Sequence, residues 1–164
     1  MTDQGHVRPL GYGAGDMALE VVRVAEHVHG HLGWLAAAAL LHPAILLRNR
    51  KRKADLSVGL STGFVTCVAA LGACLYDPYR DRLKQHIFIE ARWVGLLFER
   101  KEHLAFGAVL LAWAGAAAYT SARGARAEIQ TPLRTFAFRA FALSAALALV
   151  TACLGTVIAS YKTF

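Results

Sequence analysis

The sequence lacks the motifs that would mark a common zinc hydrolase or a nucleotide-binding enzyme. No His-Glu-x-x-His and no phosphate-binding loop occurs in its 164 residues. Residues 11–15 are rich in glycine but follow no predicted strand, so we expect no nucleotide site there. The apolar segments hold few polar residues that could line a conducting pore. These absences argue against a self-contained enzyme of those classes and against a channel.

Cysteine is scarce as well. The three cysteines, Cys67, Cys74 and Cys153, all lie inside apolar runs. An odd number of cysteines at such positions argues against disulfides and against a zinc site. We therefore expect three small, buried apolar side chains.

No secretory signal peptide is recognisable at the N-terminus. Residues 1–15 are polar and rich in glycine, without a basic segment followed by a short apolar core. We expect them to form a flexible arm. The first apolar run should then remain in the protein as a membrane anchor.

Apolar residues are abundant instead. They make up 56% of the chain, whereas roughly 45–50% is usual for a soluble domain. They are concentrated in long runs, four of which can cross a bilayer as helices. The sequence therefore predicts one all-α domain, residues 16–164, built as an integral membrane four-helix bundle. The predicted spans are about 28–47, 56–76, 103–121 and 136–161.

Residues 80–100 combine an apolar stripe at helical spacing with many charges. They predict an amphipathic interfacial helix on the membrane surface, where Arg92 and Trp93 suit the headgroup depth. The alternative is a long N-terminal extension of the third span.

The second span contains Gly59-x-x-x-Gly63. This spacing lets two membrane helices approach closely. We therefore expect these glycines to pack against another helix.

The distribution of basic residues predicts the orientation. Five of the six residues 48–53 are basic, and short basic loops stay on the cytoplasmic side. We therefore expect a multi-pass protein of the inner (cytoplasmic) membrane with both termini on the outer side. Because much of the net charge of +7 belongs to this loop, we expect no nucleic-acid binding.

Histidines cluster at the outer end of the first span. His27 and His31 are four residues apart, and His42 follows eleven residues later, so all three share one helix face with Trp34. His103 opens the third span at the same predicted depth as His31. Ionisable groups at bilayer depth are costly and usually functional.

Haem b, held between the first and third spans, is the cofactor that this pattern favours. Haem iron takes axial histidines, and His31 and His103 would supply one from each helix. Aromatic and basic neighbours could pack on the ring and meet its propionates. The candidate cofactor-binding residues are His31, His103, His27, His42, Trp34 and Arg100, with His31 and His103 as the metal ligands.

This plan resembles the four-helix membrane b-type cytochromes that anchor dehydrogenases and hydrogenases and pass electrons to quinone. The resemblance covers the whole chain and rests on the helix plan and the histidines, not on a sequence motif. It implies a small electron-transfer subunit that carries electrons between a redox partner and the quinone pool, together with other membrane subunits.

Two further interpretations stay open. Glu26 and His29 have the i, i+3 spacing of carboxylate-bridged di-metal sites, although they face away from the His27–His31 stripe and the second and fourth spans offer no matching ligand. Alternatively, the histidines are ordinary interfacial residues. The chain would then be a non-catalytic subunit that anchors or assembles a larger membrane complex.

Overall fold

The computed structural model describes residues 14–49, 52–77, 80 and 84–161, and within them the chain is helical without any strand. Residues 1–13 of the predicted arm lie outside this part, whereas Ala14 and Gly15 already belong to the first helix. The helices are α1 (Ala14–Arg48), α2 (Asp55–Cys74), α4 (Lys84–Glu90), α5 (Arg92–Gly124) and α6 (Ala127–Ser160).

Four of these helices are long and apolar enough to span a membrane: Glu20–Arg48, Asp55–Cys74, Arg92–Gly124 and Ala127–Ser160. Their apolar surfaces are compatible with contact with a lipid bilayer. The fourth helix begins at Ala127, nine residues before the predicted span, and it continues through Pro132. Only Ala125 and Arg126 separate α5 from α6, which makes these helices a tight antiparallel pair.

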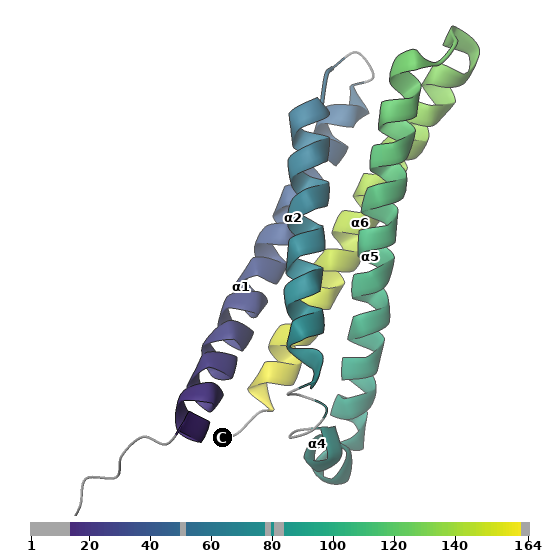
Figure 1. Ribbon diagram of the computed structural model, residues 1–164. Helices are drawn as coiled ribbons and strands as arrows, with labels where there is room; N and C mark the ends of the chain where they lie inside the picture. The colour runs from purple at the N-terminus through teal and green to yellow at the C-terminus, as the bar shows by residue number, and fades with distance from the viewer. Residues whose placement is uncertain (1–13, 50–51, 78–79, 81–83, 162–164) are drawn as a thin grey trace, which may run out of the picture.

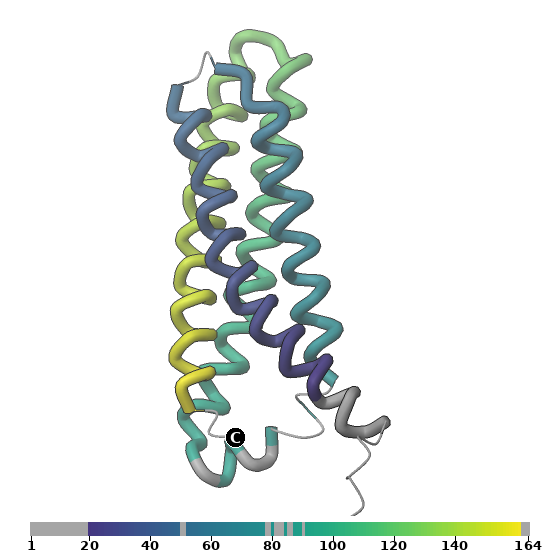
Figure 2. The backbone as a smooth tube through the Cα atoms, turned by 90° about the vertical axis from the view of Figure 1, so that its left-hand side faces the viewer, coloured from purple at the N-terminus to yellow at the C-terminus, as the bar shows by residue number. Residues whose placement is uncertain are grey.

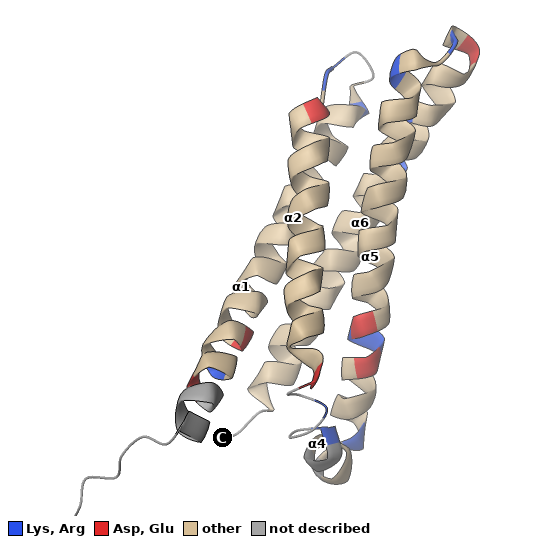
Figure 3. Cartoon of the chain, viewed as in Figure 1, with Lys and Arg blue, Asp and Glu red and all other residues tan. Residues whose placement is uncertain are grey.

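Charged residues gather towards the two ends of the long helices (Figure 3). Each long helix coincides with a stretch of 20 to 22 residues without Lys, Arg, Asp or Glu, which runs one or two residues past the end of α6 and of α2. At a rise of 1.5 Å per residue these stretches are about 30 Å long, which matches the hydrocarbon core of a bilayer. The stretches are residues 27–47, 56–76, 103–122 and 140–161, and we call them together the uncharged belt.

The long helices pack in a closed order around a square. The neighbouring pairs are α1–α2, α2–α5, α5–α6 and α6–α1, so α1 and α5 occupy diagonally opposite corners (Figures 1 and 2). The α5–α6 pair makes the most extensive contact, and α4 packs on α5. Buried side chains of α1 and α5 belong to the same core, although these two helices make no extensive contact.

Small side chains form much of the contact surface between helices. Ala108, Ala112 and Ala137 are buried, and alanine both favours the helix and lets helices approach closely in a membrane. A Cβ atom on Gly115 would lie 3.0 Å from the Phe141 ring, so α5 and α6 touch there. The largest fully buried side chains among the described residues include Leu40, Leu47, Val94, Tyr119 and Phe141.

The segment predicted as one surface helix is divided in the structure. Its described part has the short helix α4 and then, after Ala91, the start of α5, which continues without interruption into the third span. The alternative, an N-terminal extension of the third span, is therefore correct for residues 92–100. Residues 81–83 lie outside the described part of the chain.

All three cysteines are free, but they are exposed on the helix surface instead of being buried. The prediction of buried side chains was wrong because a thiol is apolar enough to face lipid. Small size alone does not direct a residue inward when the solvent is itself apolar.

Candidate functional site

The predicted histidine stripe shares one face of α1, and this face is exposed. His27, His31, His42 and Trp34 are all exposed. The buried face of α1 consists of Ala36, Ala37, Leu40, Pro43, Ala44 and Leu47. His31 precedes Ala36 by five residues, which turns its side chain about 140° away from the buried face.

His103 is exposed on α5 in the same way. The two histidines lie at a similar depth, as their neighbours on α6 show. Gly33, near His31, approaches Ala152, and Lys101, near His103, approaches Gly155, which is one turn further along α6. However, both side chains are exposed, and α1 and α5 are not one of the helix pairs in extensive contact. The structure thus matches the two histidines in depth but does not bring their rings together.

A haem with both axial ligands from this one chain therefore does not fit the arrangement of His31 and His103. Arg100, the expected propionate partner, is exposed as well. Two histidine rings nevertheless have a defined geometry. Nδ1 of His27 donates to the Arg23 carbonyl at 2.9 Å, and Nδ1 of His103 donates to the Glu99 carbonyl at 2.7 Å. Because Nδ1 carries the proton, Nε2 of each ring has the lone pair that can accept a bond from a donor or a metal.

Among the histidines whose side chains the structure describes, His29 faces inward. A Cβ atom on Gly72 of α2 would lie 2.8 Å from its ring, and the ring makes a hydrogen bond to the Val68 backbone. The other ring nitrogen, Nδ1, is buried without a hydrogen-bond partner. Among the described residues no group of three or more His, Cys, Asp or Glu could hold a metal ion, so nothing supports the di-metal interpretation built on Glu26 and His29.

His42 connects α1 to α2. Its Nδ1 and the Ser57 hydroxyl share a hydrogen bond of 2.8 Å. Nearby, the Ser61 hydroxyl donates to the Ala39 carbonyl at 2.6 Å. These two bonds satisfy polar groups within the uncharged belt, so His42 has a structural role in joining the helices.

Residues 59–63, GLSTG, also spell the Gly-x-Ser-x-Gly pattern of hydrolase nucleophiles. That pattern marks a nucleophile only at a sharp turn between a strand and a helix. Here it lies inside α2, and the hydroxyl of Ser61 is engaged with Ala39. The segment is therefore not a catalytic elbow.

A cavity of about 270 Å³ lies between α2 and α5. Its lining residues are Asp55, Val58, Gly59, Thr62, Gly63, Trp113, Ala116, Tyr119, Thr120 and Arg123. A Cβ atom on Gly59 or on Gly63 would meet nothing within 4 Å. The predicted close packing of these two glycines therefore does not occur within the described chain, and they form an open wall instead. We call this cavity the α2–α5 groove.

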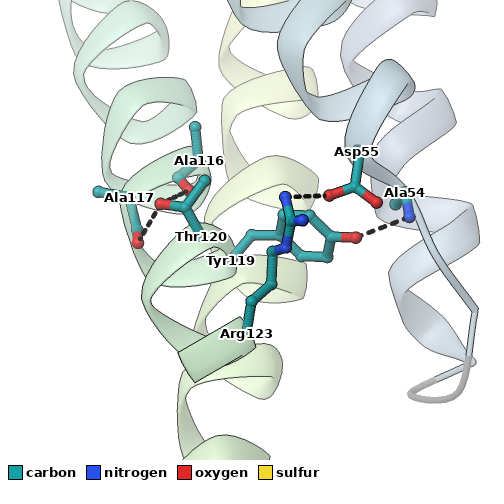
Figure 4. Close-up of polar contacts among 7 residues, drawn as sticks. All are labelled: Ala54, Asp55, Ala116, Ala117, Tyr119, Thr120 and Arg123. Atoms are coloured by element: carbon teal, nitrogen blue, oxygen red, sulfur yellow. Dashed lines mark hydrogen bonds and ion pairs between the residues drawn. The ribbon is translucent and has the colours of Figure 1, made fainter. Parts of the chain in front are cut away.

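Three polar contacts fix the sides of the groove. Tyr119 Oη accepts the backbone N–H of Ala54 at 2.8 Å, and Arg123 Nη1 lies 2.7 Å from Asp55 Oδ1 (Figure 4). Further along α5, Trp113 Nε1 donates to the Thr66 hydroxyl at 3.1 Å. Contacts from both ends of the groove thus hold α5 to α2.

Sequence reasoning missed this groove, although one signal pointed to it. The Gly59–Gly63 pair indicated a place where something approaches α2 closely. The pattern could not tell whether that neighbour belongs to this chain.

Comparison of the chain with models of protein families, with curated proteins and with solved structures found no match.

Proposed function

We propose that this chain is a non-catalytic membrane subunit that anchors or assembles a larger membrane complex. The observation that carries the proposal is the exposed polar face of α1, with His27, His31 and Trp34. At the level of His27, His31 and Trp34 the described neighbours of α1 pack on its other faces, whereas His42, further along this face, contacts α2.

The cost of exposing imidazole to lipid supports a protein partner on this face. His31 lies four residues inside the edge of the uncharged belt, which is about 6 Å along the axis. Ionisable side chains at bilayer depth rarely face lipid and generally contact protein or a water-filled cavity. Trp34, on the same face, is of the residue type that most often anchors interfaces. A partner's membrane helix would cover both side chains.

We also propose that the protein lies in the inner (cytoplasmic) membrane, with the loop between α1 and α2 in the cytoplasm and both termini outside. Arg52 and Lys53 of this loop are exposed, and Arg123 and Arg126 lie at the same end of the helices. A short, densely basic loop at one end of a multi-pass protein supports this orientation.

The test compares complex size in mild detergent extracts of the membranes in which the protein is naturally made. The wild type should migrate as a complex larger than the monomer. The double substitution His27→Leu with His31→Leu should shift most of the protein to the monomer position. Leu149→Ala, on the exposed face of α6, is the matched control and should leave the complex intact. A wild type that migrates only as a monomer would refute the assembly role.

A second candidate function is b-type electron transfer at the same end of the molecule. The ring geometry of His27 and His103 favours it, because a metal-ligating histidine typically donates its other ring N–H to a carbonyl. Since one chain does not bring two ligands together, the second axial ligand would come from the partner. Haem b would supply one-electron transfer, with quinone as the acceptor that the resemblance implies.

This second candidate is tested on the intact complex. A haem complex shows a Soret band that shifts on reduction, and His103→Ala, which lies on α5 away from the proposed partner face of α1, should abolish it without dissociating the complex. A colourless complex would leave assembly as the only role.

A further inference from the structure

We propose that the α2–α5 groove binds one anionic phospholipid, with its phosphate at Arg123 and an acyl chain along Gly59 and Gly63. This site lies at the end of the helices that carries the α1–α2 loop. The exposed face of α1 begins at the opposite end, so the proposal does not depend on the proposed function.

The shape of the groove suits an acyl chain. Gly59 and Gly63 leave open space where side chains would stand, and Val58, Trp113 and Ala116 complete an apolar lining. The Trp113 indole is held by its bond to Thr66. The walls are therefore formed before a ligand arrives, which lowers the entropy lost on binding.

One buried polar group in the wall lacks a partner. Thr62 is 4% exposed, lines the cavity, and its hydroxyl oxygen makes no hydrogen bond. A buried hydroxyl without a partner is destabilising. Thr62 follows Asp55 by seven residues, or about 10 Å along the axis. That depth lies below a phosphate bound at the mouth, where the ester carbonyls of a lipid can accept a hydrogen bond.

The mouth of the groove is basic. Arg123 is 61% exposed at its side chain and contacts Asp55 through Nη1, whereas a guanidinium carries five N–H donors. Arg52, Lys53 and Arg126 are exposed at the same end. Basic pockets between membrane helices at the headgroup level recruit anionic lipids. Asp55 is the one acidic residue that lines the groove, and it competes with the phosphate for Arg123.

A lipid fits the groove better than a helix from a second copy or from a partner. An apolar membrane helix on this groove would leave the basic mouth without an anion. The combination of an apolar floor, a hydroxyl at intermediate depth and a cation at the mouth corresponds to the parts of a phospholipid.

The experiment uses Trp113 as the reporter. Trp34→Phe and Trp93→Phe leave Trp113 as the only tryptophan in the full chain. The protein is placed in vesicles of phosphatidylcholine to which brominated phosphatidylglycerol or brominated phosphatidylcholine is added, since bromine quenches tryptophan on contact. We expect brominated phosphatidylglycerol to reach half-maximal quenching at a mole fraction at least fivefold lower than brominated phosphatidylcholine.

Two matched variants separate the effect of the Arg123 charge from the effect of its ion pair with Asp55. Arg123→Gln and Asp55→Asn both break the same contact between α2 and α5. Only Arg123→Gln should abolish the preference for phosphatidylglycerol, whereas Asp55→Asn should keep or strengthen it because a competitor is removed. Gly59→Leu should fill the floor and reduce quenching by both lipids. Circular dichroism confirms that each variant keeps its helices.

Three outcomes would overturn the proposal. Equal quenching by the two lipids would show that the groove has no preference for an anionic headgroup. Loss of the preference in both Arg123→Gln and Asp55→Asn would show that the contact, and not the cation, is needed. Protection of Trp113 from both lipids would show that a helix covers the groove.

Discussion

Removing one hydroxyl at the top of the α2–α5 contact should destabilise the protein measurably. Tyr119→Phe deletes the oxygen that accepts the backbone N–H of Ala54. Tyr119 is 1% exposed and Ala54 is 3% exposed, so neither water nor lipid headgroups can replace the lost acceptor. The guanidinium of Arg134 lies 5.8 Å from the Tyr119 ring centre, and phenylalanine retains that ring. The substitution therefore isolates the hydroxyl.

The expected loss is about 1–2 kcal/mol in the free energy of unfolding. Leaving a buried donor unsatisfied costs roughly 1–3 kcal/mol in general, while single hydrogen bonds within membrane proteins average about 0.6 kcal/mol. The value should exceed that average because a donor is orphaned here. A change of this size alters the ratio of folded to unfolded protein by roughly 5–30-fold.

Equilibrium unfolding in mixed micelles, followed by far-ultraviolet circular dichroism, measures this free energy. Thr120→Val is the matched control, because the Thr120 hydroxyl donates only to carbonyls of its own helix, at Ala116 and Ala117 (Figure 4). It should change the free energy of unfolding by less than about 0.5 kcal/mol. If Tyr119→Phe is as mild as Thr120→Val, the Ala54 contact does not stabilise the attachment of α2.

Other substitutions test the packing and the orientation. Gly115→Leu should destabilise by about 1–3 kcal/mol or more, because its side chain would collide with Phe141, whereas Gly59→Leu should be close to neutral in the same unfolding assay. Ser144→Ala removes a fully buried bond of 2.7 Å from α6 to an α5 carbonyl and should cost about 0.6–1.7 kcal/mol. A cysteine introduced at Arg52, in a variant without the three native cysteines, should react with an impermeant maleimide only after the cytoplasmic side is opened, and labelling of intact cells would reverse the proposed orientation.

The sequence was sufficient to predict the number of membrane helices. The stretches without charge in α1, α2, α5 and α6 each match the thickness of a bilayer, and that match depends only on residue type and helical rise. The boundaries were less predictable, because Pro132 was assigned to a loop and residues 92–100 to a separate surface helix, whereas they belong to α6 and α5. Helix α6 continues through Pro132 although a proline removes one backbone hydrogen bond, and α5 includes the charged residues before the uncharged belt.

The candidate site was harder to predict for a physical reason. The spacing of His27, His31 and His42 correctly placed them on one face of α1, but spacing does not say which face turns inward. We had assumed that costly polar groups turn inward. The small residues decided instead: Ala36, Ala37 and Ala44 are buried against neighbouring helices, since association in lipid is governed by close packing.

The separation between the two proposed surfaces leads to a prediction of additivity. His31 precedes Arg48 by 17 residues, so it lies about 25 Å from the end of the helices where Arg123 meets Asp55. Changes that far apart, with no shared partner, usually act independently to within about 0.5 kcal/mol. The double variant His31→Leu with Arg123→Gln should therefore lose complex size as His31→Leu does and lose lipid preference as Arg123→Gln does, each by the single-variant amount. A complex that dissociates only when both residues are changed would mean that the bound lipid itself contributes to the partner interface, and the two surfaces would then have to be treated as one.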